Sequence, residues 1–115
     1  IGYFTKFGDG ASDITPIISL YKLQVREIAK YLKVPENIIV KRSSPHLWKD
    51  HQAEDELGVS YEEVDSIVYC LFEKKLSIDE TEKLTQIDKK TIEKIHQLHI
   101  NSEHKRSPSQ KPDRD

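Results

Sequence analysis

The sequence has no methionine, a single cysteine and no long apolar run. Because methionine is absent and the first residue is Ile1, we expect a fragment of a longer protein. One cysteine, Cys70, cannot form an intramolecular disulfide and suits a reducing compartment, so we expect a cytoplasmic location. The apolar runs fall short of the roughly 20 residues of a membrane helix, and there is no signal-peptide pattern. We therefore expect no membrane partner.

Neither sign of charge dominates the chain. It has 18 Lys and Arg against 20 Asp and Glu, a formal net charge of -2 at pH 7 and a pI near 6.2. This balance gives no electrostatic bias towards nucleic acid, so no nucleic-acid partner is expected. With 115 residues, of which 36% are hydrophobic and 33% charged, the chain is one small domain with a modest core.

The spacing of apolar residues predicts a chain made mainly of helices. The strongest segment is 19–33, where apolar residues recur every three or four positions and Pro35 provides a stop. Ser60 and Glu63 have the spacing of a capping box, and Asp88 is placed to cap a later helix. The helices predicted are 19–33, a short turn at 35–39, 60–75, 77–84 and one from Asp88 to about residue 101, with their buried stripes at Val64, Ile67, Val68 and Leu71 and at Ile92, Ile95, Leu98 and His99.

A glycine-rich bend precedes the first helix. Gly8 and Gly10 bracket Asp9, so the backbone there can adopt positive φ and approach a ligand closely. Lys6 and Asp13 lie on either side of the bend. The same residues are also typical of an ordinary surface turn, and the pattern alone leaves both readings open.

Lys22 lies in the first turn of the predicted helix 19–33. A cation there is unfavourable to the helix dipole by a few tenths of a kcal/mol, up to about 1. An anion docked on the free amides of the helix start would offset this cost. The alternative is that the side chain extends into water.

Two clusters of charged residues are candidate ligand-binding sites. The acids at 54–56 could bind Mg²⁺, but they are more typical of a solvated charge run before a helix cap, and we assign no metal ligand. His104, Lys105 and Arg106 could hold a carboxylate or a pyrophosphate, although basic residues also favour a helix end through the dipole. Pro, Ser and charged residues dominate 107–115, which predicts a flexible tail.

Residues 76–101 allow a second reading of the chain. A short helix, a turn and a longer helix are typical of a helix-turn-helix, in which Lys89, Lys90 and Lys94 would contact DNA phosphates. The acidic first helix and the absence of Arg or Asn at the start of the second argue against base readout. A small helical DNA-binding or interaction module is therefore the alternative hypothesis.

Four blocks together resemble the ammonia-dependent NAD synthetase family. They are TKFGDGASDITPIISLYK, VPENII with KRSSPHLW, DELGVSYEEVD and SEHKR, and they follow the order of that family. The resemblance implies an α/β parent enzyme with the Rossmann-like adenine nucleotide alpha-hydrolase fold. Residues 1–106 would be its mainly α-helical C-terminal part, without the SGGxDS pyrophosphate loop of the family, and so inactive alone.

The resemblance also implies an activity and a set of contacts. Members convert deamido-NAD to NAD with ATP and ammonia through an adenylated intermediate, use Mg²⁺ with ATP and form homodimers. No protein nucleophile is required, so no catalytic residue is assigned. Where the family has Pro before its ATP-binding hydroxyl this chain has Ser43, which leaves Ser43 or Ser44 as the contact. The implied contacts are Lys6, Asp13, His104 and Lys105 with deamido-NAD, and Lys22 and Ser44 with ATP.

Overall fold

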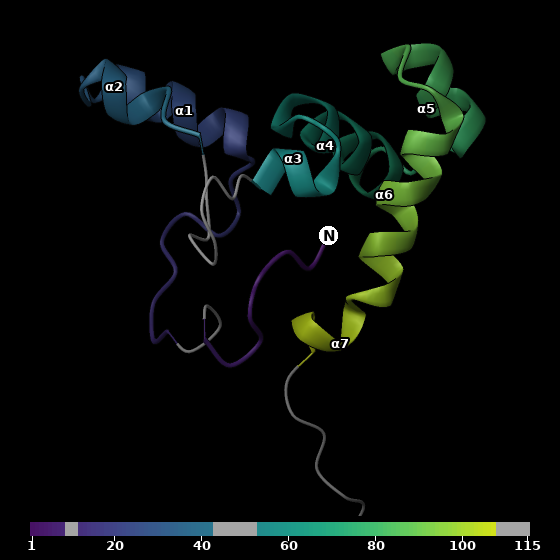
Figure 1. Cartoon of the computed structure of the whole chain (residues 1–115), viewed down its shortest axis with the longest axis horizontal. Coiled ribbons are helices and arrows are strands. Elements are labelled where there is room, and N and C mark those ends of the chain that lie inside the picture. Colours follow the sequence, from purple (N-terminus) through teal and green to yellow (C-terminus); the bar gives the residue numbers. More distant parts are fainter. Residues whose placement is uncertain (9–11, 43–52, 108–115) are drawn as a thin grey trace, which may run out of the picture.

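The structure is a computed structural model that describes residues 1–8, 12–42 and 53–107. Within these ranges it is helical and contains no strand. Helices α1 and α2 project to one side, α3 and α4 lie in the middle, and α5 to α7 form the other side (Figure 1). The elements are α1 (Lys22–Tyr31), α2 (Glu36–Ile39), α3 (Ala53–Leu57), α4 (Tyr61–Val68), the π-helical turn η1 (Tyr69–Glu73), α5 (Ile78–Thr85), α6 (Lys89–Asn101) and α7 (Glu103–Arg106).

The hydrophobic core lies between α4 and α6. Ile67 of α4 and Ile92 and Ile95 of α6 are completely buried, and the end of α3 covers them with Leu57. These positions belong to the stripes that the sequence predicts, so the prediction is confirmed for the central helices. Burying one such side chain contributes about 1.5 to 3 kcal/mol, which makes this packing the main source of stability in the described chain.

Side-chain caps fix where the central helices begin. The Ser60 hydroxyl accepts from the Glu63 amide at 3.2 Å while the Glu63 carboxylate accepts from the Ser60 amide at 2.8 Å, so the predicted capping box is confirmed. The carboxylate of Asp88 accepts from the Thr91 amide at 3.0 Å and caps α6 as predicted. Each cap satisfies an amide that the helix itself leaves unpaired.

The predicted helix 60–75 is wrong in its second half. The α-helix ends at Val68 and continues as the wider π-helical turn η1. A π turn inserts one extra residue into the helical register. Its effect here is to aim Tyr69 and Glu73 at the start of α1 while Cys70 points inward at 4% exposure, which confirms Cys70 as a core residue.

Helix α1 begins three residues later than predicted, at Lys22 and not at Ser19. Residues 16–19 instead form turns, in which the Ile18 amide donates to the Thr15 carbonyl at 3.2 Å. The amide of Tyr21 donates to the side chain of Gln24 at 2.8 Å, which sets the new helix start. Lys22 thus becomes the first helical residue.

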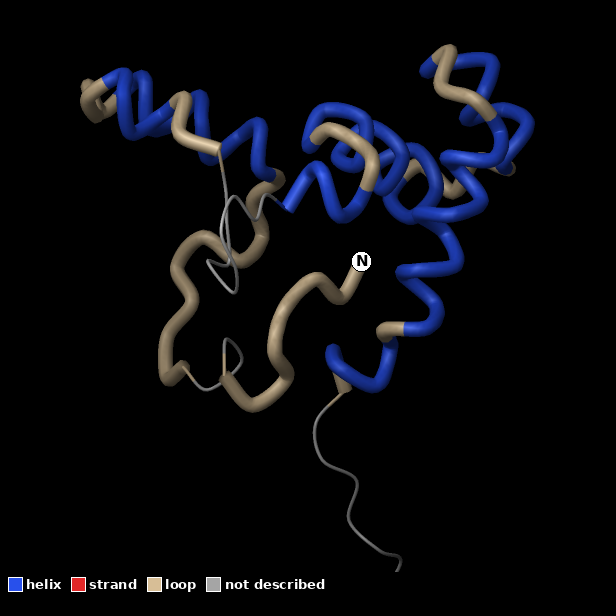
Figure 2. Tube along the Cα trace, viewed as in Figure 1, coloured by secondary structure: helices blue, strands red, loops and turns tan. Residues whose placement is uncertain are grey.

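No residue of α1 is buried. Of the apolar residues whose spacing predicts the helix, Ile18 and Leu32 are exposed at 79% and 65%, whereas Tyr21, Val25 and Ala29 are half-buried. The predicted helix forms, and its apolar face is only partly covered in the described chain. Figure 2 shows α1 and α2 as an arm that meets the rest of the chain at the start of α1.

The first eight residues contain no helix and end in a turn at residues 6–8. Gly2 has a positive φ of 72°, and a Cβ there would lie 2.0 Å from the Cβ of Ser102, so the chain passes too close to α6 and α7 for any other residue. Gly8, by contrast, does not adopt the positive φ that a glycine allows at this bend. Gly10 lies outside the described residues.

No helix in the described ranges is both long enough and apolar enough to cross a membrane. Of the predicted tail, only Ser107 belongs to the described residues.

Candidate functional site

The start of α1 carries Lys22 and is held by a carboxylate from α4. The amide of Leu23 donates to Oδ2 of Asp65 at 2.9 Å, and the Lys22 amide also contacts this carboxylate. Burial raises the pKa of Asp65, while these two backbone hydrogen bonds act in the opposite direction. The position of Lys22 suggested that an anion binds at the helix start. The anion there is the carboxylate of Asp65, which belongs to the protein itself.

The side chains of Lys22 and Arg26 lie over one aromatic ring. The Lys22 Nζ is 5.6 Å from the centroid of the Tyr61 ring, and the Arg26 guanidinium is 5.8 Å from it. Such distances allow a cation–π attraction of about 0.5 to 1 kcal/mol at exposed sites. Arg26 also forms an ion pair with Glu62 at 2.7 Å, and its buried Nε has no hydrogen-bond partner.

Tyr21, just before α1, makes a further contact with η1. Its hydroxyl donates to Oε1 of Glu73 at 2.5 Å, and its ring meets that of Tyr69 edge to face at 6.4 Å. Burial, followed by the hydrogen bond to Glu73, raises the pKa of Tyr21 above its usual value of 10.0. The first turn of α1 is therefore attached to α4 and η1 by polar and aromatic contacts along one edge. We call this set, Tyr61, Glu62, Asp65, Tyr69 and Glu73, the α1 seat.

A second cluster joins the two ends of the chain. The Lys105 Nζ donates to the carbonyl of Gly2 at 2.8 Å and to that of Phe4 at 2.9 Å, and it lies 5.7 Å from the centroid of the Phe4 ring. His104 Nδ1 is 3.1 Å from the Asn101 carbonyl. Lys105 thus holds the segment that carries Lys6, and an ammonium group still has a third N–H to donate.

Arg106 closes the C-terminal end of α6. Its guanidinium donates to the carbonyl of His99 at 2.6 Å and to the hydroxyl of Ser102 at 2.8 Å. The His99 ring stacks on Phe72 with centroids 3.8 Å apart. Burial, aided by the charge of Arg106, lowers the pKa of His99. His99 therefore packs against η1, in agreement with its predicted inward position.

The structure brings together only some of the predicted contacts. Lys105 and the segment of Lys6 lie side by side, whereas the Lys6 Nζ is 5.5 Å from the ring of its neighbour Phe7. Asp13 is exposed. Ser44, like Ser43, lies outside the described residues. Lys22 lies at the start of α1 over Tyr61, and Lys105 lies in the cluster that joins the two chain ends.

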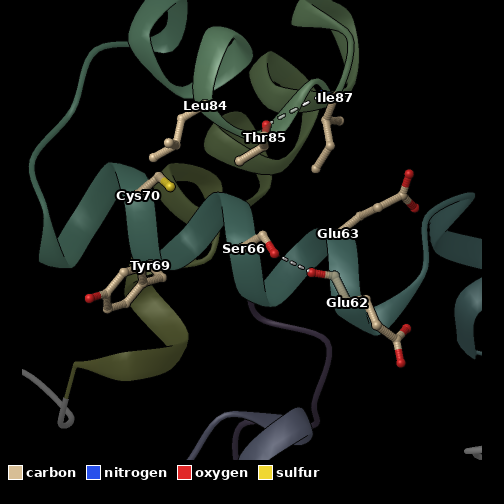
Figure 3. A pocket seen from close by; sticks show the side chains of 8 residues that line it. All are labelled: Glu62, Glu63, Ser66, Tyr69, Cys70, Leu84, Thr85 and Ile87. Atoms are coloured by element: carbon tan, nitrogen blue, oxygen red, sulfur yellow. Dashed lines mark hydrogen bonds between the residues drawn. The ribbon is translucent and has the colours of Figure 1, made fainter.

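A groove borders the α1 seat, and Glu62 and Tyr69 of the seat belong to its lining. It has a volume of about 430 Å³ and runs between α4 with η1 and the end of α5 (Figure 3). Leu84, Thr85 and Ile87 face α4 across it, and the hydroxyls of Ser66 and Thr85 are already bonded to backbone groups. It contains none of the predicted contacts.

The acids at 54–56 are engaged within the protein. Glu54 accepts from the Tyr61 amide at 3.1 Å, Asp55 pairs with Arg42 at 2.6 Å, and Glu56 accepts from the Tyr3 hydroxyl at 2.6 Å. In the part of the chain that the structure describes, no three His, Cys, Asp or Glu side chains are grouped so as to hold a metal ion.

Two of the lysines in the helix-turn-helix alternative are also engaged. Lys89 pairs with Asp79 of the first helix at 2.6 Å, and Lys94 donates to the carbonyl of Leu57. Only Lys90 of the three is left without such a contact among the described residues. A protein that bound DNA phosphates through this face would have to break both contacts, so the DNA-binding alternative is not favoured.

The α1 seat and its partner Arg26 were not predicted from the sequence. Arg26 is four residues beyond Lys22 and so on the same helix face, which is a signal that could have been used. The partners on α4 gave no such signal. Asp65 is 42 positions from Leu23, and only the packing of α1 on α4 brings them together.

Comparison with solved structures gives the class of protein. The fold is similar to that of NMN synthetase from Francisella tularensis, with a TM-score of 0.73 and 42% sequence identity, over 96% of this chain and 41% of that one. The sequence profile of the NAD synthase family matches residues 1–109. The chain belongs to the NAD synthase family.

Curated relatives within the family are more specific. The chain is 54% identical over 113 residues to the NH(3)-dependent NAD(+) synthetase of Hyperthermus butylicus and 49% identical to that of Aeropyrum pernix. These alignments cover 98% of this chain but 41% and 40% of the two relatives. The chain thus spans about two fifths of the length of the curated relatives it matches, and the family resemblance found in the sequence is confirmed.

Proposed function

We propose that this chain is the C-terminal part of an ammonia-dependent NAD synthetase, which amidates deamido-NAD to NAD at the expense of ATP. The observation that carries the proposal is the sequence identity of 54% and 49% to two NH(3)-dependent NAD(+) synthetases over 98% of this chain. Residues 1–106 belong to one domain with an α/β parent fold. The helical region described above supplies contacts around a nucleotide site that the chain does not complete alone.

The proposed reaction has two steps. The nicotinate carboxylate of deamido-NAD attacks the α-phosphorus of ATP, which forms a mixed anhydride with AMP and releases pyrophosphate. Ammonia then attacks the activated carbonyl carbon, the C–N bond forms, AMP leaves and a proton is lost. Catalysis of such steps rests on positioning and on charge stabilisation, so cationic side chains suffice and no protein nucleophile is assigned.

Lys22 is the proposed contact with ATP. It begins α1, and among the described residues it has the Tyr61 ring as a neighbour but no carboxylate partner for its ammonium. A lysine without an ion pair can offer its charge to a phosphate. Ser44 is its proposed companion in ATP binding.

Deamido-NAD is assigned to the cluster in which Lys105 joins the two chain ends. Lys105 already binds two backbone carbonyls, which leaves one N–H for the dinucleotide. His104 lies beside it on α7, and Lys6 belongs to the segment 1–8 that Lys105 anchors. Asp13 is the fourth proposed contact with this substrate.

Magnesium is assigned to the ATP substrate and not to this chain. The acids at 54–56 are engaged by Arg42, Tyr61 and Tyr3, and the described residues offer no three-ligand cluster. No step of the mechanism is routed through a metal held here. The whole protein is proposed to be a cytoplasmic homodimer, as the family resemblance implies.

The test is NAD formation by a full-length synthetase that contains these 115 residues. Lys22→Ala is expected to reduce ATP-dependent NAD formation by about a hundredfold or more, within the range seen when one transition-state donor is removed, while the melting temperature stays unchanged. Lys90→Ala, an exposed lysine of α6, is the matched control and keeps wild-type turnover. Unchanged turnover by Lys22→Ala would contradict the assignment.

The same assay decides between substrates. Because the solved neighbour is named an NMN synthetase, deamido-NAD and the corresponding mononucleotide acid are offered in competition. Preference for deamido-NAD supports the proposal, and preference for the mononucleotide replaces it with the shorter substrate.

A further inference from the structure

Helix α1 differs from the other long helices in how it is held. It buries no side chain, whereas α4 and α6 are fixed by Ile67, Ile92 and Ile95. A helix whose apolar side chains are at most half-buried depends more on directional contacts for its position. For α1 these contacts are concentrated at its first two turns, which is where Lys22 lies.

One face of α4 supplies most of these contacts. Tyr61 and Asp65 are four residues apart, with Glu62 beside them, and residues at that spacing share a helix face. Tyr61 lies under the cations of Lys22 and Arg26, while Asp65 receives the first amides of the helix. The Asp65 carboxylate therefore contacts the backbone of Lys22 while the Tyr61 ring contacts its side chain.

The Asp65 carboxylate also removes a competing anion site. Free amides at a helix start attract phosphate, and here those of Lys22 and Leu23 are occupied. A phosphate brought to this end of α1 would meet the negative charge of Asp65 at the amides and the positive charge of the Lys22 side chain beyond them. The arrangement directs an anion to the side chain.

We propose that Asp65 is a positioning residue for ATP binding, which fixes the Lys22 ammonium by holding the first turn of α1 against α4. The inference rests on the proposed function, because it assigns the ATP contact to Lys22. Asp65 itself does not touch the nucleotide. It acts through the oxygen that accepts from the amides of Lys22 and Leu23.

The first experiment compares KM values in a full-length synthetase that contains this chain. Asp65→Ala should raise KM for ATP about tenfold, the equivalent of about 1.4 kcal/mol, and leave KM for deamido-NAD within about twofold. Asp65→Asn keeps an oxygen that accepts from the amides and should bring KM for ATP back to within about twofold of wild type. Asp79→Ala removes an exposed carboxylate from α5 and is the matched control, with both KM values unchanged.

A loss of folded protein is distinguished from a loss of positioning. Fewer folded molecules lower the apparent kcat and leave both KM values alone. A double-mutant cycle adds a second criterion: in a Lys22→Ala background, Asp65→Ala should have no further effect on KM for ATP, because the group it positions is gone. Additive effects, unchanged KM for ATP in Asp65→Ala or an equal rise in both KM values would overturn the inference.

Equilibrium binding of a non-hydrolysable ATP analogue separates this inference from the proposed function. Wild-type protein that binds the analogue but forms no NAD would refute the function alone, and weaker binding by Asp65→Ala would still support the inference. Wild-type protein that forms NAD, with analogue binding unaffected by Asp65→Ala, would refute the inference alone. Wild-type protein that binds no analogue would refute both.

Discussion

Helices α1 and α6 have similar amphipathic sequences, yet they are held in opposite ways. In α6, Ile92 and Ile95 are completely buried. In α1 no residue is buried, and Ile28 remains 43% exposed. The difference teaches that a periodic pattern specifies a helix but not the surface that covers it. In the described chain α6 is secured by apolar packing and α1 by the polar seat at its first turns.

Removal of a core side chain from α6 should have the largest effect on stability, and the same change on α1 should have little. Ile92→Ala should lower the free energy of unfolding of the 115-residue chain by about 2 to 5 kcal/mol, because the cavity it leaves adds to the lost burial. The matched change on the other helix, Ile28→Ala, should cost less than about 0.5 kcal/mol. Urea unfolding followed by circular dichroism measures both, and equal losses would show that α1 is packed as tightly as α6.

The tie between the chain ends should have the next largest effect. Lys105→Met removes the donor to the carbonyls of Gly2 and Phe4, at a cost of about 1.5 kcal/mol for a charged hydrogen bond. Hydrogen exchange in residues 1–8 should then rise while exchange in α6 does not change. Lys90→Met is the control on an exposed lysine. Unaltered exchange in residues 1–8 would mean that Lys105 does not anchor them.

A buried hydroxyl offers a change in the stabilising direction. Thr81 on α5 is completely buried, and its Oγ1 has no hydrogen-bond partner. Thr81→Val keeps the shape and removes the unsatisfied group, so thermal unfolding should show a gain of about 1 kcal/mol. Thr81→Ser keeps the hydroxyl and loses a methyl group, and it should be no more stable than wild type. A loss of stability in Thr81→Val would show that the hydroxyl is in fact satisfied.

The smallest effect concerns pH. Burial, followed by the charges of Arg106 and His96, lowers the pKa of His99, and Glu103 opposes them. In the unfolded chain the pKa of His99 returns to its ordinary value of 6.5. As the pH falls below 6.5, the unfolded chain therefore binds more protons at His99 than the folded chain. Stability is therefore complete above that value and falls as the pH drops towards the folded pKa. His99→Gln should flatten this dependence in unfolding experiments between about pH 7.5 and about pH 5.5.

Local features were predictable from the sequence. The Ser60 capping box, the Asp88 cap and the buried Ile92 depend on residues within a few positions of each other or on helical periodicity, and the structure confirms all three. The family was identified from four short blocks, and it is confirmed by relatives that cover nearly the whole chain.

Features that depend on packing were not predictable. The start of α1 moved to Lys22 because the side chain of Gln24 and the distant Asp65 satisfy its amides, and nothing in the local sequence announces Asp65. The π-helical turn makes contacts with distant elements, from Tyr69 to Tyr21 and from Phe72 to His99, which the local sequence does not announce. The site assignments for Lys6, Asp13 and Ser44 stay predictions, which the substrate assays above would test.

The central claim is that polar contacts, and not burial, hold α1 and its Lys22 in place. Hydrogen exchange of the chain, resolved to peptides from α1 and α6, measures this most directly. Amides around Ile92 and Ile95 should be the slowest to exchange, those of 24–31 should exchange much faster, and Asp65→Ala should accelerate α1 while α6 keeps its rate. Protection in α1 equal to that in α6, and indifferent to Asp65, would contradict the account.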